Sequence, residues 1–162
     1  MWLPPEQPSG KRRPSTSEGF LFLDSVIDSA IIQAYLETNY RVQAVPSFTL
    51  HIGTVSSDLL TLYGRHKVDC AAFITAWNPF SQDVSEAENI ERQQSLATEL
   101  TRRSLSFFKG IGQHPSNNWI GEESFLVLGL NLEAAKTMGI HFEQNAIVWC
   151  GPDALPQLIV LR

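Results

Sequence analysis

The sequence contains few cysteines and no pattern of residues that would bind a metal. Its 162 residues include two cysteines, Cys70 and Cys150, which lie far apart and have no second cysteine or histidine at zinc-site spacing. Both lie in apolar stretches, so we expect free, buried thiols. We accordingly expect no metal site and no cofactor.

Long apolar runs are missing as well. No stretch approaches the roughly twenty apolar residues that a membrane-spanning helix needs. The first residues do not show a basic segment followed by an apolar one, so we expect no signal peptide. These two absences predict a cytoplasmic protein with no membrane partner.

Positive charge is scarce beyond the N-terminal segment. The chain has 12 lysines and arginines against 17 aspartates and glutamates, a formal net charge of −5. After Lys11-Arg12-Arg13, the one pair of adjacent basic residues is Arg102-Arg103. Nucleic-acid binding relies on a basic surface that displaces counterions, so we expect no nucleic-acid partner.

Familiar catalytic motifs are absent too. The chain has neither a P-loop nor the Gly-x-Ser-x-Gly turn of the α/β-hydrolases. Gly110 and Gly112 lack the third glycine and the following helix of a dinucleotide site. The sequence therefore does not decide whether the protein is an enzyme.

The chain does contain enough periodic sequence for one domain. Residues 1–19 are rich in proline and hydroxyl residues and predict a flexible tail, whereas residues 20–162 predict a single α/β domain. Its first part predicts a helix, a strand and a second helix: from Asp24 or Ser25 to Thr38, from Ser47 to Ile52, and from Ser56 or Ser57 to about Gly64.

The second part alternates strands and helices more regularly. The patterns predict strands at 71–77, 105–111, 124–130, 145–150 and 157–161, and helices at 86–103 and 132–138. Ser85 and Asn131 are the expected N-caps, and Gly139 the expected helix stop. The first six elements follow the order β-α-β-β-α-β, which predicts an α+β fold with a ferredoxin-like core and a C-terminal hairpin strand. A doubly wound parallel sheet is the alternative.

A ligand site is predicted where the strand at 71–77 ends at Asn78-Pro79 and a helix begins. Polar side chains at such a corner can hydrogen-bond a carboxylate or phosphate, and the helix dipole favours negative charge. The expected ligand-binding residues there are Asn78, Ser81, Asn89 and Arg92. The same residues could instead tie the loop to the helix, with Arg92 paired to a nearby acid.

Further candidates surround this corner. Glu122 and Glu123 are adjacent, so on a strand they point to opposite faces and at most one can lie in the site; we select Glu123 as a general base. Trp119 could stack on a ligand, and Gln144 reaches the corner if its strand lies beside the first. His114 is a conceivable proton carrier.

These residues give the chain a family resemblance. The chain resembles a bacterial family known as domain of unknown function 3293. The matching residues are Thr75-Ala76-Trp77-Asn78-Pro79 with Ser81, then Asn89, Arg92, Trp119, Glu122-Glu123-Ser124 and Phe142-Glu143-Gln144-Asn145-Ala146. The resemblance runs from about residue 30 to the C-terminus. It implies no particular activity.

Three hypotheses follow from the sequence. The first is a small domain that binds a polar anionic molecule, nucleotide-like or carboxylate-bearing, at the corner. The second is a non-catalytic protein-interaction module, which a buried and mutually hydrogen-bonded Asn78 and Asn89 would favour. The third is a hydrolase that uses Glu123 and His114.

Overall fold

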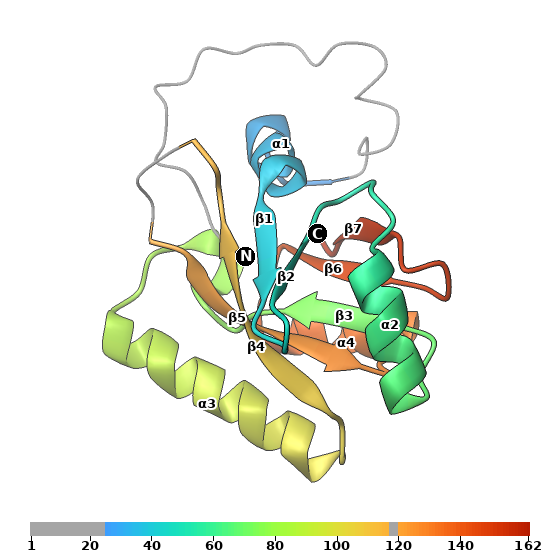
Figure 1. Ribbon diagram of the computed structural model, residues 1–162. Helices are drawn as coiled ribbons and strands as arrows, with labels where there is room; N and C mark the ends of the chain where they lie inside the picture. Colours follow the sequence, from blue (N-terminus) through green and yellow to red (C-terminus); the bar gives the residue numbers. More distant parts are fainter. Residues whose placement is uncertain (1–24, 117–119) are drawn as a thin grey trace.

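A seven-stranded sheet runs through the molecule, and all neighbouring strands are antiparallel (Figure 1). The computed structural model describes residues 25–116 and 120–162; the predicted tail, residues 1–19, and Trp119 lie outside them. The strand order is β2-β1-β4-β5-β3-β6-β7. The strands are β1 (Asn39–Val42), β2 (Phe48–Leu50), β3 (Ala71–Ile74), β4 (Phe107–Gln113), β5 (Glu122–Leu128), β6 (Ala146–Cys150) and β7 (Pro156–Val160).

The described residues form four α-helices: α1 (Ser29–Glu37), which precedes the first strand, and α2 (Ser57–His66), α3 (Glu86–Arg102) and α4 (Leu132–His141), which connect strands. Helix α3 leads from β3 to β4 and α4 from β5 to β6, and each pair of strands is separated in the sheet by one other strand. The α+β class is confirmed, as is the C-terminal hairpin of β6 and β7. The doubly wound parallel sheet is wrong for the described residues, because every neighbouring pair is antiparallel.

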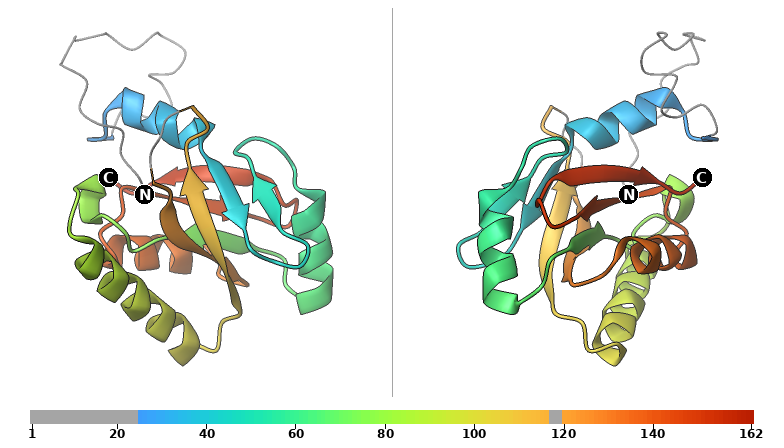
Figure 2. Two further views of the ribbon diagram at one scale, coloured as in Figure 1. Left: turned by 60° about the vertical axis from the view of Figure 1, so that its left-hand side comes forward. Right: turned by 90° about the vertical axis from the view of Figure 1, so that its right-hand side faces the viewer.

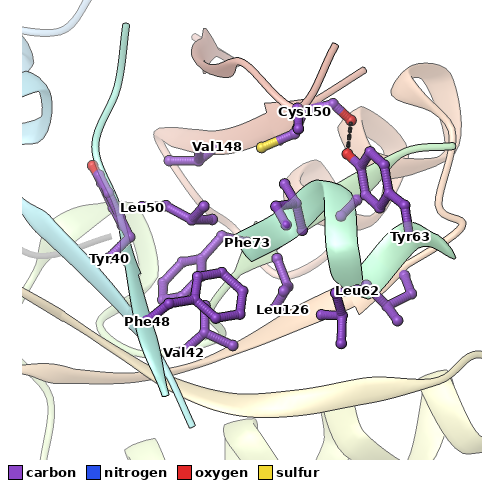
Figure 3. Close-up of a cluster of buried hydrophobic side chains, with 14 of the residues drawn as sticks. Tyr40, Val42, Phe48, Leu50, Leu62, Tyr63, Phe73, Leu126, Val148 and Cys150 are labelled. Carbon is purple, nitrogen blue, oxygen red and sulfur yellow. Dashed lines mark hydrogen bonds between the residues drawn. The ribbon is translucent and has the colours of Figure 1, made fainter. Parts of the chain in front are cut away.

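The helices cover the two faces of the sheet in pairs (Figure 2). Helices α3 and α4 bury Leu96, Leu100 and Met138 against one face, with Val127 and Ile147 of the sheet beneath them. Helices α1 and α2 cover the opposite face. Figure 3 shows that second cluster, in which the aromatic rings of Tyr40, Phe48 and Phe73 pack together with aliphatic side chains of the sheet and of α2.

The helix ends follow their capping residues. Ser85 Oγ accepts from Glu88 N at 3.1 Å and Asn131 Oδ1 from Ala134 N at 2.9 Å, so both predicted N-caps are confirmed. Helix α1 begins at Ser29, later than expected, and Asp28 is its N-cap: Asp28 Oδ1 accepts from Ala30 N at 2.7 Å.

Gly139 does not end its helix, in contrast to the prediction. It lies inside α4, where an added Cβ would come within 2.8 Å of Ile147 Cγ2 and 2.6 Å of Leu161 Cδ1. The glycine therefore allows α4 to approach β6 closely, and the helix continues to His141.

Strand β1 is not among the predicted elements. It has four residues and follows α1 after a single residue, with Tyr40 and Val42 buried and Arg41 exposed. Its short alternation was too brief to distinguish from the end of the helix. The strand nevertheless links β2 to β4 and so completes the sheet.

The two cysteines are free and buried, as expected. Burial raises the pKa of the Cys150 thiol to about 12, so it stays protonated and unreactive at neutral pH. Within residues 25–116 and 120–162, none of the helices combines the length and the apolar character that crossing a membrane requires.

Candidate functional site

The predicted corner is a tight backbone turn between β3 and α3. A short 3-10 turn, Pro79–Ser81, follows the strand, and Asn78, Phe80 and Ser81 all have left-handed backbones with φ of 46°, 50° and 58°. Such conformations cost energy for residues other than glycine. Here they are held by backbone hydrogen bonds, of which Phe80 N to Glu143 O, at 2.6 Å, ties the turn to the end of α4.

Asn78 and Asn89 face each other across this turn. The Asn89 carboxamide accepts from Asn78 N at 2.7 Å and donates to Asn78 Oδ1 at 2.9 Å. Asn78 Nδ2 donates to Glu122 Oε1 at 3.3 Å, and Val84 N donates to Asn78 Oδ1 at 3.4 Å. Both asparagines are buried, so these bonds satisfy groups that water does not reach.

Arg92 holds the beginning of α3 to two other segments. Its Nε donates to Ala76 O at 2.8 Å, and one terminal nitrogen donates to Phe142 O at 2.7 Å. The other terminal nitrogen lies 3.5 Å from Glu143 Oε1. The planar fork of the guanidinium thereby joins the end of β3 to the end of α4.

Ser81 and Gln144 complete the predicted cluster. Ser81 Oγ accepts from Asn145 Nδ2 at 2.7 Å and shares a 2.8 Å hydrogen bond with the Tyr35 hydroxyl. Gln144 Nε2 donates to Trp77 O and Phe142 O, at 3.2 and 3.1 Å. Strand β6 pairs with β3, which was the condition for Gln144 to reach the corner.

The five predicted ligand-binding residues that the structure describes thus lie together. Their side chains hydrogen-bond one another and nearby backbone groups, linking β3, α3 and the connection from α4 to β6. This is the arrangement expected if the corner ties segments of the chain together. Trp119, the sixth predicted residue, lies outside the described residues.

The two adjacent glutamates point to opposite faces of β5. Glu122, rather than Glu123, lies beside Asn78, and it is buried. Burial raises the pKa of Glu122, an effect that the hydrogen bond from Asn78 opposes. Glu123 is exposed on the α3 side of the sheet, whereas His114 bonds Glu37 of α1 at 2.9 Å on the other side.

A groove lies between α3 and strands β4 and β5, and we call it the α3 groove. Its volume is about 340 Å³, within the range of pockets that hold small molecules. Its lining combines apolar side chains with amides and charges of both signs: Gln43, Ile90, Gln93, Gln94, Ala97, Lys109, Gly110, Ile111, Glu123, Ser124 and Phe125.

Gln93 is the unusual residue of this groove. It is 4 % exposed, and its Oε1 accepts from Ala76 N at 3.0 Å. Because a backbone N–H can only donate, this bond fixes which end of the carboxamide is oxygen. The other end, Nε2, is buried and has no hydrogen-bond partner among the residues that the structure describes. A buried donor without an acceptor costs about 1–3 kcal/mol.

Gln93 lies on the buried face of α3 but is not among the predicted site residues. The available signal was a polar residue in line with Leu96 and Leu100. Glu122 was set aside in favour of its neighbour because the strand was expected to begin two residues later than it does. The described residues contain no group of His, Cys, Asp or Glu side chains that could hold a metal ion.

Comparison with known proteins gives one family match. Residues 74–147 match the family described as "Protein of unknown function (DUF3293)", and this segment contains the corner, α3, both glutamates and Gln144. Neither the curated proteins nor the solved structures give a significant match to the chain. The match supports the resemblance seen in the sequence, over the segment from the end of β3 into β6.

Proposed function

We propose that the protein binds a small carboxylate-bearing molecule in the α3 groove. The observation that carries this proposal is the buried Gln93 Nε2, a donor without an acceptor at the wall of a groove of ligand size. A carboxylate oxygen placed against Nε2 would supply the missing acceptor. The ligand remains the polar anionic class expected from the sequence, but its site is one turn along α3 from the predicted corner.

The charges and apolar surfaces of the groove support the same ligand class. Lys109 gives the groove a cation that attracts a carboxylate, while Ile90 and Phe125 offer apolar surface to the rest of the molecule. Lys109 and Gln94 line the same groove with exposed side chains, and the proposal requires the groove wall to move enough for a ligand to reach the buried Nε2 of Gln93.

The groove offers little support for catalysis. Glu123 is its one carboxylate, and the groove contains neither a cysteine nor a histidine beside it. The hydrolase hypothesis pairs Glu123 with His114, but the two side chains lie on opposite faces of the sheet. We therefore propose binding without a chemical step.

A thermal-shift screen of small carboxylates tests the proposal. The set includes butyrate, benzoate and leucine, each beside the matching primary alcohol that lacks the carboxylate. A ligand that binds the folded state alone adds about 2.7 kcal/mol of stability at one hundred times its Kd, which raises the Tm by several degrees. We expect at least one carboxylate, but not its alcohol, to produce such a rise.

Gln93→Glu is the sharpest variant for this screen. It keeps an oxygen for Ala76 N and replaces the donor Nε2 with a second oxygen, so the carboxylate should no longer bind. Gln157→Glu makes the same chemical change at an exposed position on β7 and should bind as the native protein does. Equal shifts in native protein and Gln93→Glu would contradict the proposed site.

The protein-interaction module is the second candidate. It is favoured by the corner, where Asn78, Asn89 and Arg92 bond to the protein itself. This candidate predicts that no small carboxylate changes the Tm of the native protein. It likewise predicts that none changes the Tm of Gln93→Glu.

A further inference from the structure

Two opposite charges line the α3 groove without pairing with each other. Lys109 of β4 and Glu123 of β5 are both in its wall. The sheet register sets Lys109 opposite Phe125 and Glu123 opposite Ile111, so the two charged residues are diagonal neighbours on the face that α3 covers. Neither side chain forms a hydrogen bond or an ion pair with another described residue. Both charges are therefore available to a ligand.

The polar groups of the groove differ in what they can bind. The buried Gln93 Nε2 and the Lys109 ammonium only donate hydrogen bonds, whereas the ionised Glu123 carboxylate only accepts them. A ligand that carries a carboxylate alone would satisfy Gln93 and Lys109 but would be repelled by Glu123. The groove is better matched by a ligand with an acceptor of negative charge on one side and a donor of positive charge beside it.

The size and the apolar lining of the groove limit the rest of the ligand. Its volume of about 340 Å³ is near the lower end of the range for small-molecule pockets. Ile90, Ala97 and Phe125 contribute apolar surface. A nucleotide fits this lining poorly, because its phosphates would meet Glu123 with one lysine to bind them. A small molecule with a short apolar chain fits it better.

We propose that the α3 groove binds a free α-amino acid with an apolar side chain. The α-carboxylate accepts from Gln93 Nε2 and faces Lys109, the α-ammonium donates to Glu123, and the side chain packs on Ile90 and Phe125. An α-amino acid carries its two opposite charges on a single carbon, as two neighbouring residues of opposite charge require. Glu123 thereby has a binding role in place of the general-base role expected from the sequence.

This inference rests on the proposed function, since it uses the same groove and the same bond to Gln93. Isothermal titration of the full chain with leucine and with 4-methylpentanoate separates the two claims. The second compound has the carbon skeleton and the carboxylate of leucine but no amine. Leucine should bind about tenfold more tightly or better, as expected for a hydrogen bond between charged groups. N-acetyl-leucine, whose nitrogen carries no charge, should also bind more weakly than leucine.

Glu123→Gln tests the residue that receives the ammonium. The position is exposed, so the change leaves the core intact. Leucine binding should weaken about tenfold or more in this variant, while 4-methylpentanoate should bind at least as tightly as it does to the native protein. Glu91→Gln makes the same chemical change at an exposed position on α3 outside the groove lining and should bind both compounds as the native protein does.

The outcomes distinguish failure of the inference from failure of the proposed function. If 4-methylpentanoate binds the native protein as tightly as leucine, the ammonium makes no contact, and this inference is overturned while the carboxylate site stands. If neither compound binds, both claims are overturned. Equal leucine affinity in the native protein and in Glu123→Gln would also overturn the inference, whatever 4-methylpentanoate does.

Discussion

Asn78 and Asn89 are joined by two hydrogen bonds, one through the Asn78 backbone N at 2.7 Å and one between their carboxamides at 2.9 Å. The first residue ends the connection from β3, and the second lies in the first turn of α3. Their contact fixes where α3 begins relative to the sheet. It thereby also sets the position of Gln93, one helical turn further along.

Asn89→Leu should destabilise the protein by about 1–3 kcal/mol. The change removes both hydrogen bonds and leaves two polar groups of Asn78 buried without this partner. Urea denaturation measures the loss. Ser95→Ala, on the exposed side of the same helix, should change the free energy of unfolding by less than about 0.5 kcal/mol. A loss no larger for Asn89→Leu than for Ser95→Ala would show that the contact contributes nothing.

Arg92→Lys should destabilise the protein even though the charge is kept. A lysine cannot reproduce the guanidinium fork that donates to both Ala76 O and Phe142 O. Hydrogen bonds from charged donors are worth about 1.5–3 kcal/mol, so the loss should approach that range. Denaturation at neutral pH measures it. A lysine variant as stable as the native protein would show that the charge alone matters.

The sequence predicted much of the fold because most elements carry strong local signals. Helix α3 has a capping serine and a regular apolar face, and its bounds agree with the prediction to one residue. Strand β1 lacks such a signal, because four residues contain only two apolar side chains. Gly139 was predicted to end its helix because glycine is common at helix ends. Its actual role is to let α4 pack closely against Ile147, and this contact cannot be read from the neighbouring sequence.

The site was predicted less well than the fold, for a related reason. The sequence identified polar residues at a strand end, and these do lie together. It could not show that these side chains would hydrogen-bond to the protein itself, because their partners include Phe142 and Glu143, about fifty residues away from Arg92. That Gln93 Nε2 has no acceptor can be recognised only when the positions of all neighbouring groups are known.

The two glycines inside helices should respond oppositely to alanine. Gly64→Ala in α2 places its Cβ in open space and should stabilise the protein by about 0.5–1 kcal/mol. Gly139→Ala in α4 brings its Cβ within 2.8 Å of Ile147 Cγ2, a stiff and buried side chain, and should destabilise it by about 1–3 kcal/mol. Thermal unfolding of both variants measures the difference. Changes of the same sign would contradict the close packing of α4.

Glu122 should make the protein less stable as pH rises. Its folded-state pKa is raised above the ordinary value of 4.5, so the folded protein holds this proton more tightly than the unfolded chain does. The stabilisation is fully present below about pH 4.5 and is lost as pH rises through the raised pKa. Urea denaturation between pH 4 and about 8 should therefore show a flatter pH dependence for Glu122→Gln than for Glu91→Gln. Parallel curves would contradict the assignment.

The most direct test of the proposed function follows the side-chain amide of Gln93 by NMR. Its NH₂ signals, assigned by comparison with Gln93→Glu, are recorded as the best carboxylate from the thermal-shift screen is added, and again with the matching alcohol. A carboxylate that bonds Nε2 should move these signals downfield in a saturable way, while the alcohol and the side chain of Gln157 show no such change. If a carboxylate binds and the Gln93 signals stay where they are, the ligand occupies another site and the α3 groove is not the binding site.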